Sequence, residues 1–172
     1  MKEQVVLVDE NDNPIGSSEK LDAHVKGILH RAFSVFVFNS EGKLLLQKRA
    51  HSKYHSAGLW TNTCCGHPRP GEDILGAAKR RLKEEMGINS DLHEVFHFTY
   101  NEKLENNLTE NEYDHVFFGA CDHVPQPDPL EASEWKFANC DELKNQIKEK
   151  PELFTVWFRL CFDKMYEKKF PK

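Results

Sequence analysis

The sequence predicts an α/β fold of the α+β type, in which mixed β-sheets are sandwiched between helices. β-rich and helical stretches follow one another in the order β, helix, β, helix, which favours such a sandwich over a regular parallel βαβ array. The 172 residues are enough for one sizeable core and few for two, and no linker rich in Gly, Pro or Ser divides them. We therefore expect a single domain over residues 1–172.

The first half of the chain combines predicted strands with one helix. The stretch "VVLVDENDNPIG" (5–16) is typical of a strand that enters a turn, and "AFSVFVFNSEGKLLLQKRA" (32–50) of two strands around a Ser-Glu-Gly turn. From Glu72 to Met86, apolar residues recur at i, i+4 spacing, acids begin the segment and Gly87 ends it. This segment is predicted to be an amphipathic helix.

The second half repeats the alternation. Strands are expected over "HEVFHFTY" (93–100) and "HVFFGAC" (115–121), with the polar segment 101–114 as a loop between them. Asp141 is expected to cap a helix with the sequence "DELKNQIKEK". The stretch "PELFTVWFRLCFDKMYEKKF" (151–170) predicts a final amphipathic helix.

Composition argues against several classes of protein. The net charge of −5, without a basic stripe, argues against nucleic-acid binding. No stretch approaches the roughly 20 apolar residues that span a bilayer, so we expect a soluble protein without stable membrane association. The N-terminus lacks an export signal, which predicts a cytoplasmic location. The five cysteines lack CxxC spacing and are expected to be reduced, and the sequence does not indicate an oligomeric state.

One segment, "TNTCCGHPRPGE" (61–72), gathers two cysteines, a histidine and an acid into a stretch that cannot be an ordinary helix. Together with the predicted helix it matches G-x5-E-x7-R-E-U-x-E-E-x-G-U, where U is apolar, at every fixed position except one. This pattern resembles the box of the Nudix family, in which helix carboxylates hold Mg²⁺ against a diphosphate. Glu84 and Glu85 are available for such an ion, since Mg²⁺ prefers oxygen ligands and shares its coordination with substrate phosphates.

The exception is Arg81, which stands where Nudix hydrolases carry the first Glu of this helix. A cation among the metal-binding carboxylates disfavours hydrolysis of a nucleoside diphosphate derivative. Arg81 lies four residues before Glu85, so it is expected to pair with that carboxylate or to point at a phosphate. A Nudix diphosphohydrolase is therefore the alternative interpretation and not the leading one.

Motifs elsewhere make the resemblance more specific. The stretches "HVKGILH" (24–30), "RAHSK" (49–53), "GLWTNTCCGHP" (58–68) and "ENE" (110–112) resemble those of type I isopentenyl diphosphate isomerases, a family with the Nudix fold, and the likeness extends over residues 20–157. It implies an enzyme that converts isopentenyl diphosphate to dimethylallyl diphosphate in isoprenoid biosynthesis. A third interpretation, a non-enzymatic metal-binding module, leaves the Nudix helix unexplained.

The resemblance also implies two divalent ions. One lies on three imidazoles and two carboxylates, a mixed set of ligands that suits Mn, Zn or Fe. The other, Mg²⁺, arrives with the substrate diphosphate and binds Glu85. The ligands implied for the first ion are His24, His30, His67, Glu110 and Glu112. The remaining histidines are expected on the surface or in local hydrogen bonds: His51, His55, His93, His97, His115 and His123.

Isomerisation of this substrate adds a proton to an alkene carbon and removes another from a neighbouring carbon, with tertiary-carbocation character in between. The resemblance places Cys65 and Glu112 on opposite faces of the substrate as the proton-transfer groups, with Tyr100 tuning Glu112, and leaves open which group delivers the first proton. Trp157 is implied as the aromatic that stabilises the cation, although its apolar neighbours are equally typical of a core residue. The cations implied at the diphosphate are Lys20, Arg49, Lys53 and Arg81. The cysteines expected in packing are Cys64, Cys121, Cys140 and Cys161.

Overall fold

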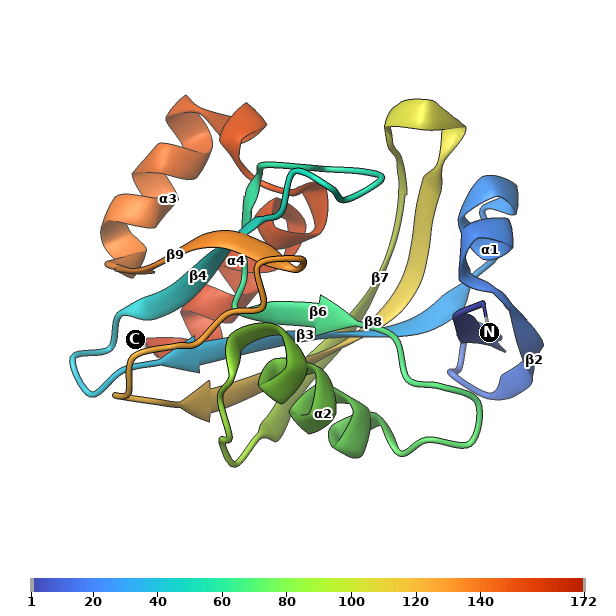
Figure 1. Ribbon diagram of the computed structural model, residues 1–172, viewed down its shortest axis with the longest axis horizontal. Helices are drawn as coiled ribbons and strands as arrows, with labels where there is room; N and C mark the ends of the chain where they lie inside the picture. The colour runs from blue at the N-terminus through green and yellow to red at the C-terminus, as the bar shows by residue number, and fades with distance from the viewer. Residues whose placement is uncertain (1, 172) are drawn as a thin grey trace.

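The computed structural model describes residues 2–171, and within them nine strands form one hydrogen-bonded network (Figure 1). The strands are β1 (Gln4–Val8), β2 (Pro14–Glu19), β3 (His30–Phe38), β4 (Leu44–Arg49), β5 (Trp60–Thr61), β6 (Cys64–Gly66), β7 (His93–Lys103), β8 (Thr109–Ala120) and β9 (Ala132–Ala138). Strand β3 is central, because it pairs antiparallel with β1, β4 and β6 and parallel with β8. The predicted mixed sheet is confirmed.

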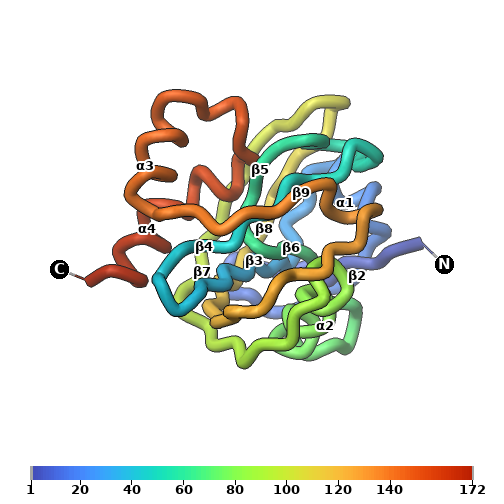
Figure 2. Tube along the Cα trace, turned by 60° about the vertical axis from the view of Figure 1, so that its left-hand side comes forward, coloured from blue at the N-terminus to red at the C-terminus, as the bar shows by residue number. Residues whose placement is uncertain are grey.

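Helices cover both faces of this sheet (Figures 1 and 2). They are α1 (Lys20–Lys26), α2 (Ile74–Met86), α3 (Cys140–Glu149) and α4 (Val156–Lys169), with short 3-10 turns η1 (Glu105–Asn107) and η2 (Pro151–Leu153). Val35 and Val37 of β3 pack in the same cluster as the apolar side chains of α2, whereas Phe36 and Phe38 pack with those of α4. A strand buried on both faces carries apolar residues at successive positions, as β3 does from Val35 to Phe38.

Helix α2 is close to its predicted extent. The Asp73 side chain caps it by accepting a hydrogen bond from the Gly76 backbone N–H at 2.8 Å, so the helix begins at Ile74 and not at Glu72. Gly87 ends it in the left-handed conformation, with φ of 67°. A Cβ atom at Gly87 would lie 2.8 Å from a backbone oxygen of the loop that follows β8, so glycine is needed there on two counts.

The expectation of a polar loop over residues 101–114 is wrong. Strand β7 continues to Lys103 and β8 begins at Thr109, so the two form a long antiparallel hairpin. The turn is made by Asn106 and Asn107, which both adopt positive φ, a conformation that asparagine tolerates better than most residues. The acids at the start of β8 are buried, and a search for apolar alternation does not recognise them as strand residues.

The C-terminal helices also begin at other residues than predicted. Helix α3 is capped by Asn139 and not by Asp141, because Asn139 Oδ1 accepts hydrogen bonds from the backbone N–H groups that follow it. Pro151 begins a separate 3-10 turn, and α4 starts only at Val156. Five elements of two to seven residues, too short for a periodic signal, were not predicted: α1, β2, β5, β6 and β9.

The five cysteines are free thiols, as expected. Within residues 2–171, none of the helices combines the length and the apolar character that a bilayer crossing requires.

Candidate functional site

Strands β3 and β8 carry the centre of the site. Their parallel register places His30 beside Glu112, and the two-residue period of β8 turns Glu110 and Glu112 to the same face. On the other side of β8, the register with β7 sets Tyr100 opposite Glu112. All four side chains are buried. Pairing of strands that are distant in sequence therefore brings four of the predicted site residues together.

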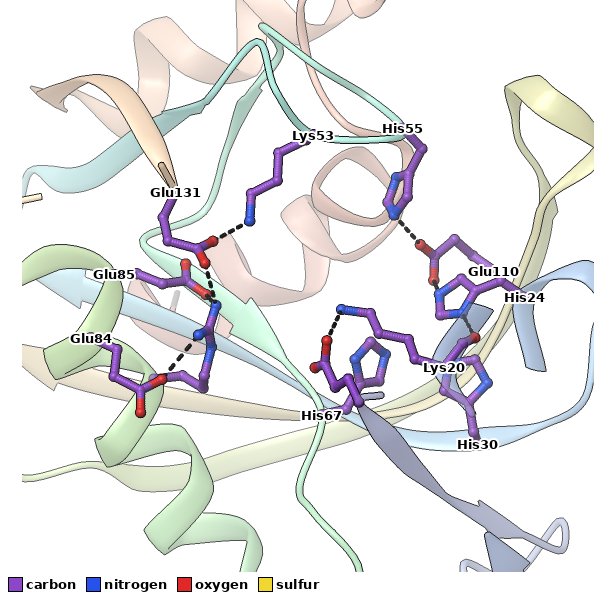
Figure 3. Close-up of polar contacts among 12 residues, drawn as sticks. Lys20, His24, His30, Lys53, His55, His67, Glu84, Glu85, Glu110 and Glu131 are labelled. Carbon is purple, nitrogen blue, oxygen red and sulfur yellow. Dashed lines mark hydrogen bonds and ion pairs between the residues drawn. The ribbon is translucent and has the colours of Figure 1, made fainter. Parts of the chain in front are cut away.

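Two further imidazoles complete a cluster at this point. His24 comes from the buried face of α1, and His67 follows β6 directly. One donor atom from each of His24, His30, His67 and Glu112 can be chosen so that all four lie within 4.8 Å of one another. Figure 3 shows the three rings on the same side of the site as Glu110.

Backbone carbonyls orient two of these rings. The Nδ1 atoms of His24 and His30 lie 2.7 Å and 2.8 Å from the carbonyl oxygens of Lys20 and Ile28. A carbonyl only accepts, so each Nδ1 carries a proton, and in the neutral ring each Nε2 keeps its lone pair. The Nε2 of His24 faces Glu110 Oε2 at 3.4 Å, and that of His30 faces the Glu112 carboxylate at 3.5 Å.

These facing acceptors fit a cation. A neutral imidazole nitrogen and a carboxylate oxygen both offer lone pairs, so they favour an ion between them over direct contact. His24 Nε2, His30 Nε2 and Glu110 Oε2 are buried and have no hydrogen-bond partner within residues 2–171. Nitrogen and oxygen donors in this mixture suit a divalent transition metal. The residues present therefore fit a divalent metal centre.

Glu112 has the most polar contacts in the cluster. Tyr100 donates its hydroxyl proton to Oε2 at 2.6 Å, and His67 Nε2 lies 2.8 Å from Oε1. Burial alone would raise the pKa of Glu112, but its polar neighbours, with His30 and Tyr100 among them, hold that pKa below its usual value. Two residues further along β8, the pKa of Asp114 is raised well above its usual value by burial and by the nearby Glu112 charge. No motif in the sequence marks Asp114.

His55, expected on the surface or in a local hydrogen bond, is not on the surface, although its ring does contact the adjacent Ser56. Its side chain is only 4% exposed, and its Nε2 lies 3.5 Å from Glu110 Oε1. His24, His55 and Glu110 form a second group of possible ligands. No motif marks His55, and the one available signal is that it lies two residues after Lys53, already expected at the substrate. His51, His93, His97 and His123 are exposed, as expected, whereas the half-buried His115 contacts Glu94 and Asp12, which are distant in sequence.

The neighbouring cysteines differ in environment. Strand β6 pairs with β3 so that Cys65 lies opposite Ser34, and the strand period turns Cys64 to the other face. Cys64 is fully buried in the cluster around α2, whereas Cys65 is half-buried and lines the cavity described below. Burial raises the pKa of the Cys65 thiol to about 12, partly opposed by the charge of Arg49. The thiol is therefore protonated at neutral pH.

A cavity connects these groups. It encloses about 610 Å³, part of which is open solvent, and this size suits a small-molecule ligand. Most of the residues predicted for catalysis and binding line it, whereas His24 and His30 do not. The predicted residues on its wall are Lys20, Arg49, Lys53, Cys65, His67, Arg81, Glu85, Tyr100, Glu110, Glu112 and Trp157.

Cations and carboxylates gather at the α2 side of the cavity, away from the imidazoles (Figure 3). Arg81 Nη2 lies 2.5 Å from Glu85 Oε1, as the four-residue spacing predicted, and 3.3 Å from Glu131 Oε1. Glu131 also pairs with Lys53. Glu131 was not predicted, because it stands alone in a loop after a proline without any motif. It is nevertheless the carboxylate that links two of the predicted diphosphate cations.

The remaining predicted residues lie between these two sides. Lys20 Nζ is 3.2 Å from Glu3 Oε2. The guanidinium carbon of Arg49 lies 5.3 Å from the centre of the Trp157 ring, in a cation–π arrangement. Trp157 is 4% exposed and belongs to the core cluster around α4, yet it also lines the cavity. Both readings of this residue from the sequence are therefore compatible with its position.

Comparison with known proteins gives close relatives over nearly the whole chain. Isopentenyl-diphosphate Delta-isomerase 1 from Aromatoleum aromaticum is 53% identical over 165 residues, which cover 96% of this chain and 93% of that protein. Isopentenyl-diphosphate Delta-isomerase 2 from Photorhabdus laumondii is 57% identical over 159 residues, which cover 92% of this chain and 90% of that protein.

Family and fold comparisons agree with these relatives. The NUDIX domain matches residues 28–158. A crystal structure of a protein from Deinococcus radiodurans superposes with a TM-score of 0.81 at 20% identity and covers 95% of this chain and 99% of that one, which shows a shared fold. The α+β fold expected from the sequence is thus the Nudix fold. The chain belongs to the NUDIX domain family and, within it, to the isopentenyl-diphosphate Delta-isomerases.

Proposed function

We propose that this protein converts isopentenyl diphosphate to dimethylallyl diphosphate as an isomerase of isoprenoid biosynthesis, with residues 1–172 acting as one catalytic domain. One observation carries the mechanism: a single cavity is lined by a thiol, a buried carboxylate with its tyrosine, an aromatic ring, and a separate group of cations. The thiol and the carboxylate suit proton transfer to and from an alkene, the ring suits the positive charge formed in between, and the cations suit a diphosphate. Arg81, paired with Glu85, argues against the diphosphohydrolase.

The metal centre is proposed on His24, His30, His67, Glu110 and Glu112. The ligand set favours Mn, Zn or Fe, and Mg²⁺ is proposed to bind Glu85 together with the substrate diphosphate. When bound, the ion on the cluster supplies positive charge that fixes the two carboxylates and favours the ionised form of Glu112. The protein orients the ligands itself, through the two backbone carbonyls that hold the rings of His24 and His30.

The proposed proton-transfer groups are Cys65 and Glu112, with Tyr100 as the hydrogen-bond donor to Glu112. One group supplies a proton to the alkene while the other accepts one, so the substrate neither gains nor loses charge overall. The thiol of Cys65 is protonated, and the pKa of Glu112 is held low by its hydrogen bonds, so the site contains one proton donor and one acceptor. The diphosphate is proposed to contact Lys20, Arg49, Lys53 and Arg81.

Incubation of the metal-loaded protein with isopentenyl diphosphate and Mg²⁺ in D₂O tests the function. Proton and phosphorus NMR should show dimethylallyl diphosphate that contains deuterium, because the protein group that protonates the alkene has exchanged its own proton for deuterium. Release of inorganic phosphate or pyrophosphate would instead identify a hydrolase. Tight metal binding without any reaction of this substrate would favour the non-enzymatic metal-binding module.

Trp157→Leu is expected to lower kcat by about 30-fold, and Trp157→Phe by clearly less, because an aromatic face stabilises a desolvated cation by about 2 kcal/mol. Steady-state rates of dimethylallyl diphosphate formation measure both. Phe158→Leu is the control: Phe158 is buried beside Trp157 but does not line the cavity, so this change should lower stability and leave kcat nearly unaltered. Equal losses for the two Trp157 variants would indicate packing alone.

Lys53→Gln is expected to raise KM for isopentenyl diphosphate by about tenfold or more, with a smaller effect on kcat, because a charge-assisted hydrogen bond to phosphate contributes about 1.5–3 kcal/mol. Lys48→Gln is the matched control, since Lys48 pairs with Glu134 and does not line the cavity. An unchanged KM for Lys53→Gln would show that Lys53 does not contact the diphosphate.

A further inference from the structure

His55 is buried at the site and has no part in the mechanism proposed above. It is carried by the loop between β4 and β5, which passes over the cavity (Figure 3). Its ring lies between Glu110, a proposed metal ligand, and Trp157, the proposed aromatic wall of the site. Nε2 is 3.5 Å from Glu110 Oε1, and the ring meets Trp157 edge to face, with centroids 5.9 Å apart and planes at 81°. His55 therefore contacts both the proposed metal ligand and the aromatic wall.

Glu110 is held between two imidazoles, one on each oxygen. Its Oε2 faces His24 Nε2 at 3.4 Å on the side of the proposed ion, whereas its Oε1 faces His55. The Nδ1 of His55 lies 3.4 Å from the hydroxyl of Ser56, which can donate to it and leave the proton on Nε2, directed at Glu110. In metal sites, the outer oxygen of a ligating carboxylate commonly receives such a contact, which fixes the orientation of the carboxylate.

The loop that presents His55 is itself fixed in place. Its backbone N–H at Ser56 donates to Glu105 Oε1 at 2.7 Å, and Asn106 Nδ2 donates to the Tyr54 carbonyl at 3.2 Å, so the tip of the β7–β8 hairpin holds the loop from one side. From the other side, Arg49 Nη2 donates to the His55 carbonyl at 3.2 Å.

Ser56 adopts a φ of 49°, in the left-handed region that serine rarely occupies. Such strain persists only where the surroundings over-determine the backbone, and it concentrates at functional sites. The strain and the three hydrogen bonds together keep the backbone at His55 in one place, so the direction of its ring is set by the fold and not left to the solvent.

We infer that His55 is a positioning residue that orients Glu110 from outside the metal cluster and sets this carboxylate relative to the Trp157 ring. The inference rests on the proposed metal-ligand role of Glu110. His55 acts through Glu110 and not as a ligand itself, because its ring is 6.1 Å from that of His24, whereas the rings of His24, His30 and His67 lie 4.8–5.7 Å from one another.

The test measures metal affinity, which needs no substrate. Apoprotein is titrated with Zn²⁺ against a chromophoric chelator for the wild type, His55→Ala, His55→Gln and His51→Ala. His51 is the matched control, an exposed histidine in the same loop. We expect His55→Ala to weaken Zn²⁺ binding by about tenfold or more, His51→Ala to bind like the wild type, and His55→Gln, whose amide N–H can reach Glu110, to recover most of the affinity.

The same variants are then compared in turnover. Lys53 and Arg81 lie on the other side of the cavity, and Arg49 bonds only to the backbone carbonyl of His55, which His55→Ala retains, so this change should lower kcat and leave KM within about twofold of the wild type. Thermal unfolding of the apoproteins checks folding, and His55→Gln keeps the test valid if His55→Ala is unstable.

Three results would overturn the inference. Wild-type Zn²⁺ affinity in His55→Ala would show that His55 is not needed to orient the Glu110 carboxylate. Equal losses in His55→Ala and His55→Gln would show a purely structural role. X-ray absorption of the Zn²⁺ protein that counts four imidazoles instead of three would make His55 a ligand. A wild-type protein that binds no Zn²⁺ would overturn the proposed metal centre itself, whereas metal binding without isomerisation would overturn the proposed reaction and leave the role of His55 intact.

Discussion

Cys65→Ser is expected to lower the rate of isomerisation by about 10³-fold or more, because it removes one of the two proton-transfer groups, and each such group contributes about 10²–10⁴-fold. Serine keeps the size and the hydrogen-bonding capacity of the side chain. Its hydroxyl is a much weaker acid than a thiol, however, so it donates a proton to the alkene far less readily. The rate of deuterium incorporation into dimethylallyl diphosphate in D₂O measures the loss directly.

Cys64→Ser is the control for this substitution. Cys64 is adjacent in sequence but faces the core around α2, so the new hydroxyl is buried without a designed partner and costs about 1–3 kcal/mol of stability. The melting temperature should fall, while kcat per folded molecule stays close to that of the wild type. A fully active Cys65→Ser protein would refute the assignment of Cys65, and an inactive but folded Cys64→Ser protein would show that the wrong cysteine had been chosen.

Glu112→Gln should remove both turnover and tight metal binding. The amide cannot carry the negative charge that the ion and the neighbouring His67 meet in the wild type, and it cannot accept a proton from the substrate. We expect a loss of about 10³-fold or more in kcat and of about 10-fold or more in metal affinity. Metal content after desalting and the rate of dimethylallyl diphosphate formation measure the two effects separately.

Glu102→Gln gives the matched control on the neighbouring strand β7. Glu102 pairs in register with Glu110 but does not line the cavity, so neither metal content nor rate should change. If Glu112→Gln kept its metal and lost only turnover, Glu112 would be a proton-transfer residue and not a ligand. If it kept both, neither proposed role would survive.

The elements that the sequence predicted well are those whose local signal agrees with their packing. Helix α2 has an apolar stripe from Ile74 to Met86, an aspartate cap and a glycine end. Its sequence pattern therefore predicts both its extent and its buried face. Strand β3 is buried on both faces and is apolar throughout its second half, from Val35 to Phe38. Here the sequence pattern and the tertiary structure carry the same information.

Prediction failed where function replaces the apolar pattern. The start of β8 carries Glu110, Glu112 and Asp114 at alternate positions, facing inward. Apolar periodicity classes such acids as loop residues, and only their pairing with distant strands buries them. Family resemblance supplied Glu110 and Glu112 because they belong to a motif. It supplied nothing for Asp114, which belongs to none.

The same reasoning explains the missed site residues. His55 and Glu131 stand alone in loops, and the position of a loop side chain depends on which other segments hold the loop. For His55 these are the tip of the β7–β8 hairpin and Arg49, and for Glu131 they are Lys53 and Arg81. Arg49 is only six residues from His55, but the other three contacts span about fifty residues or more, so no short window of the sequence contains them.

The parallel pairing of β3 with β8 also has a consequence for how the protein folds. The paired residues lie about 80 positions apart in the chain, and such contacts form slowly because a long loop must close before they stabilise anything. The imidazoles of His24 and His30 precede that loop and the carboxylates of Glu110 and Glu112 follow it. In a partly folded chain these imidazoles and carboxylates are far apart, so they cannot bind one ion together. We therefore expect capture of the proposed metal to come late in folding and to draw the equilibrium toward the folded structure.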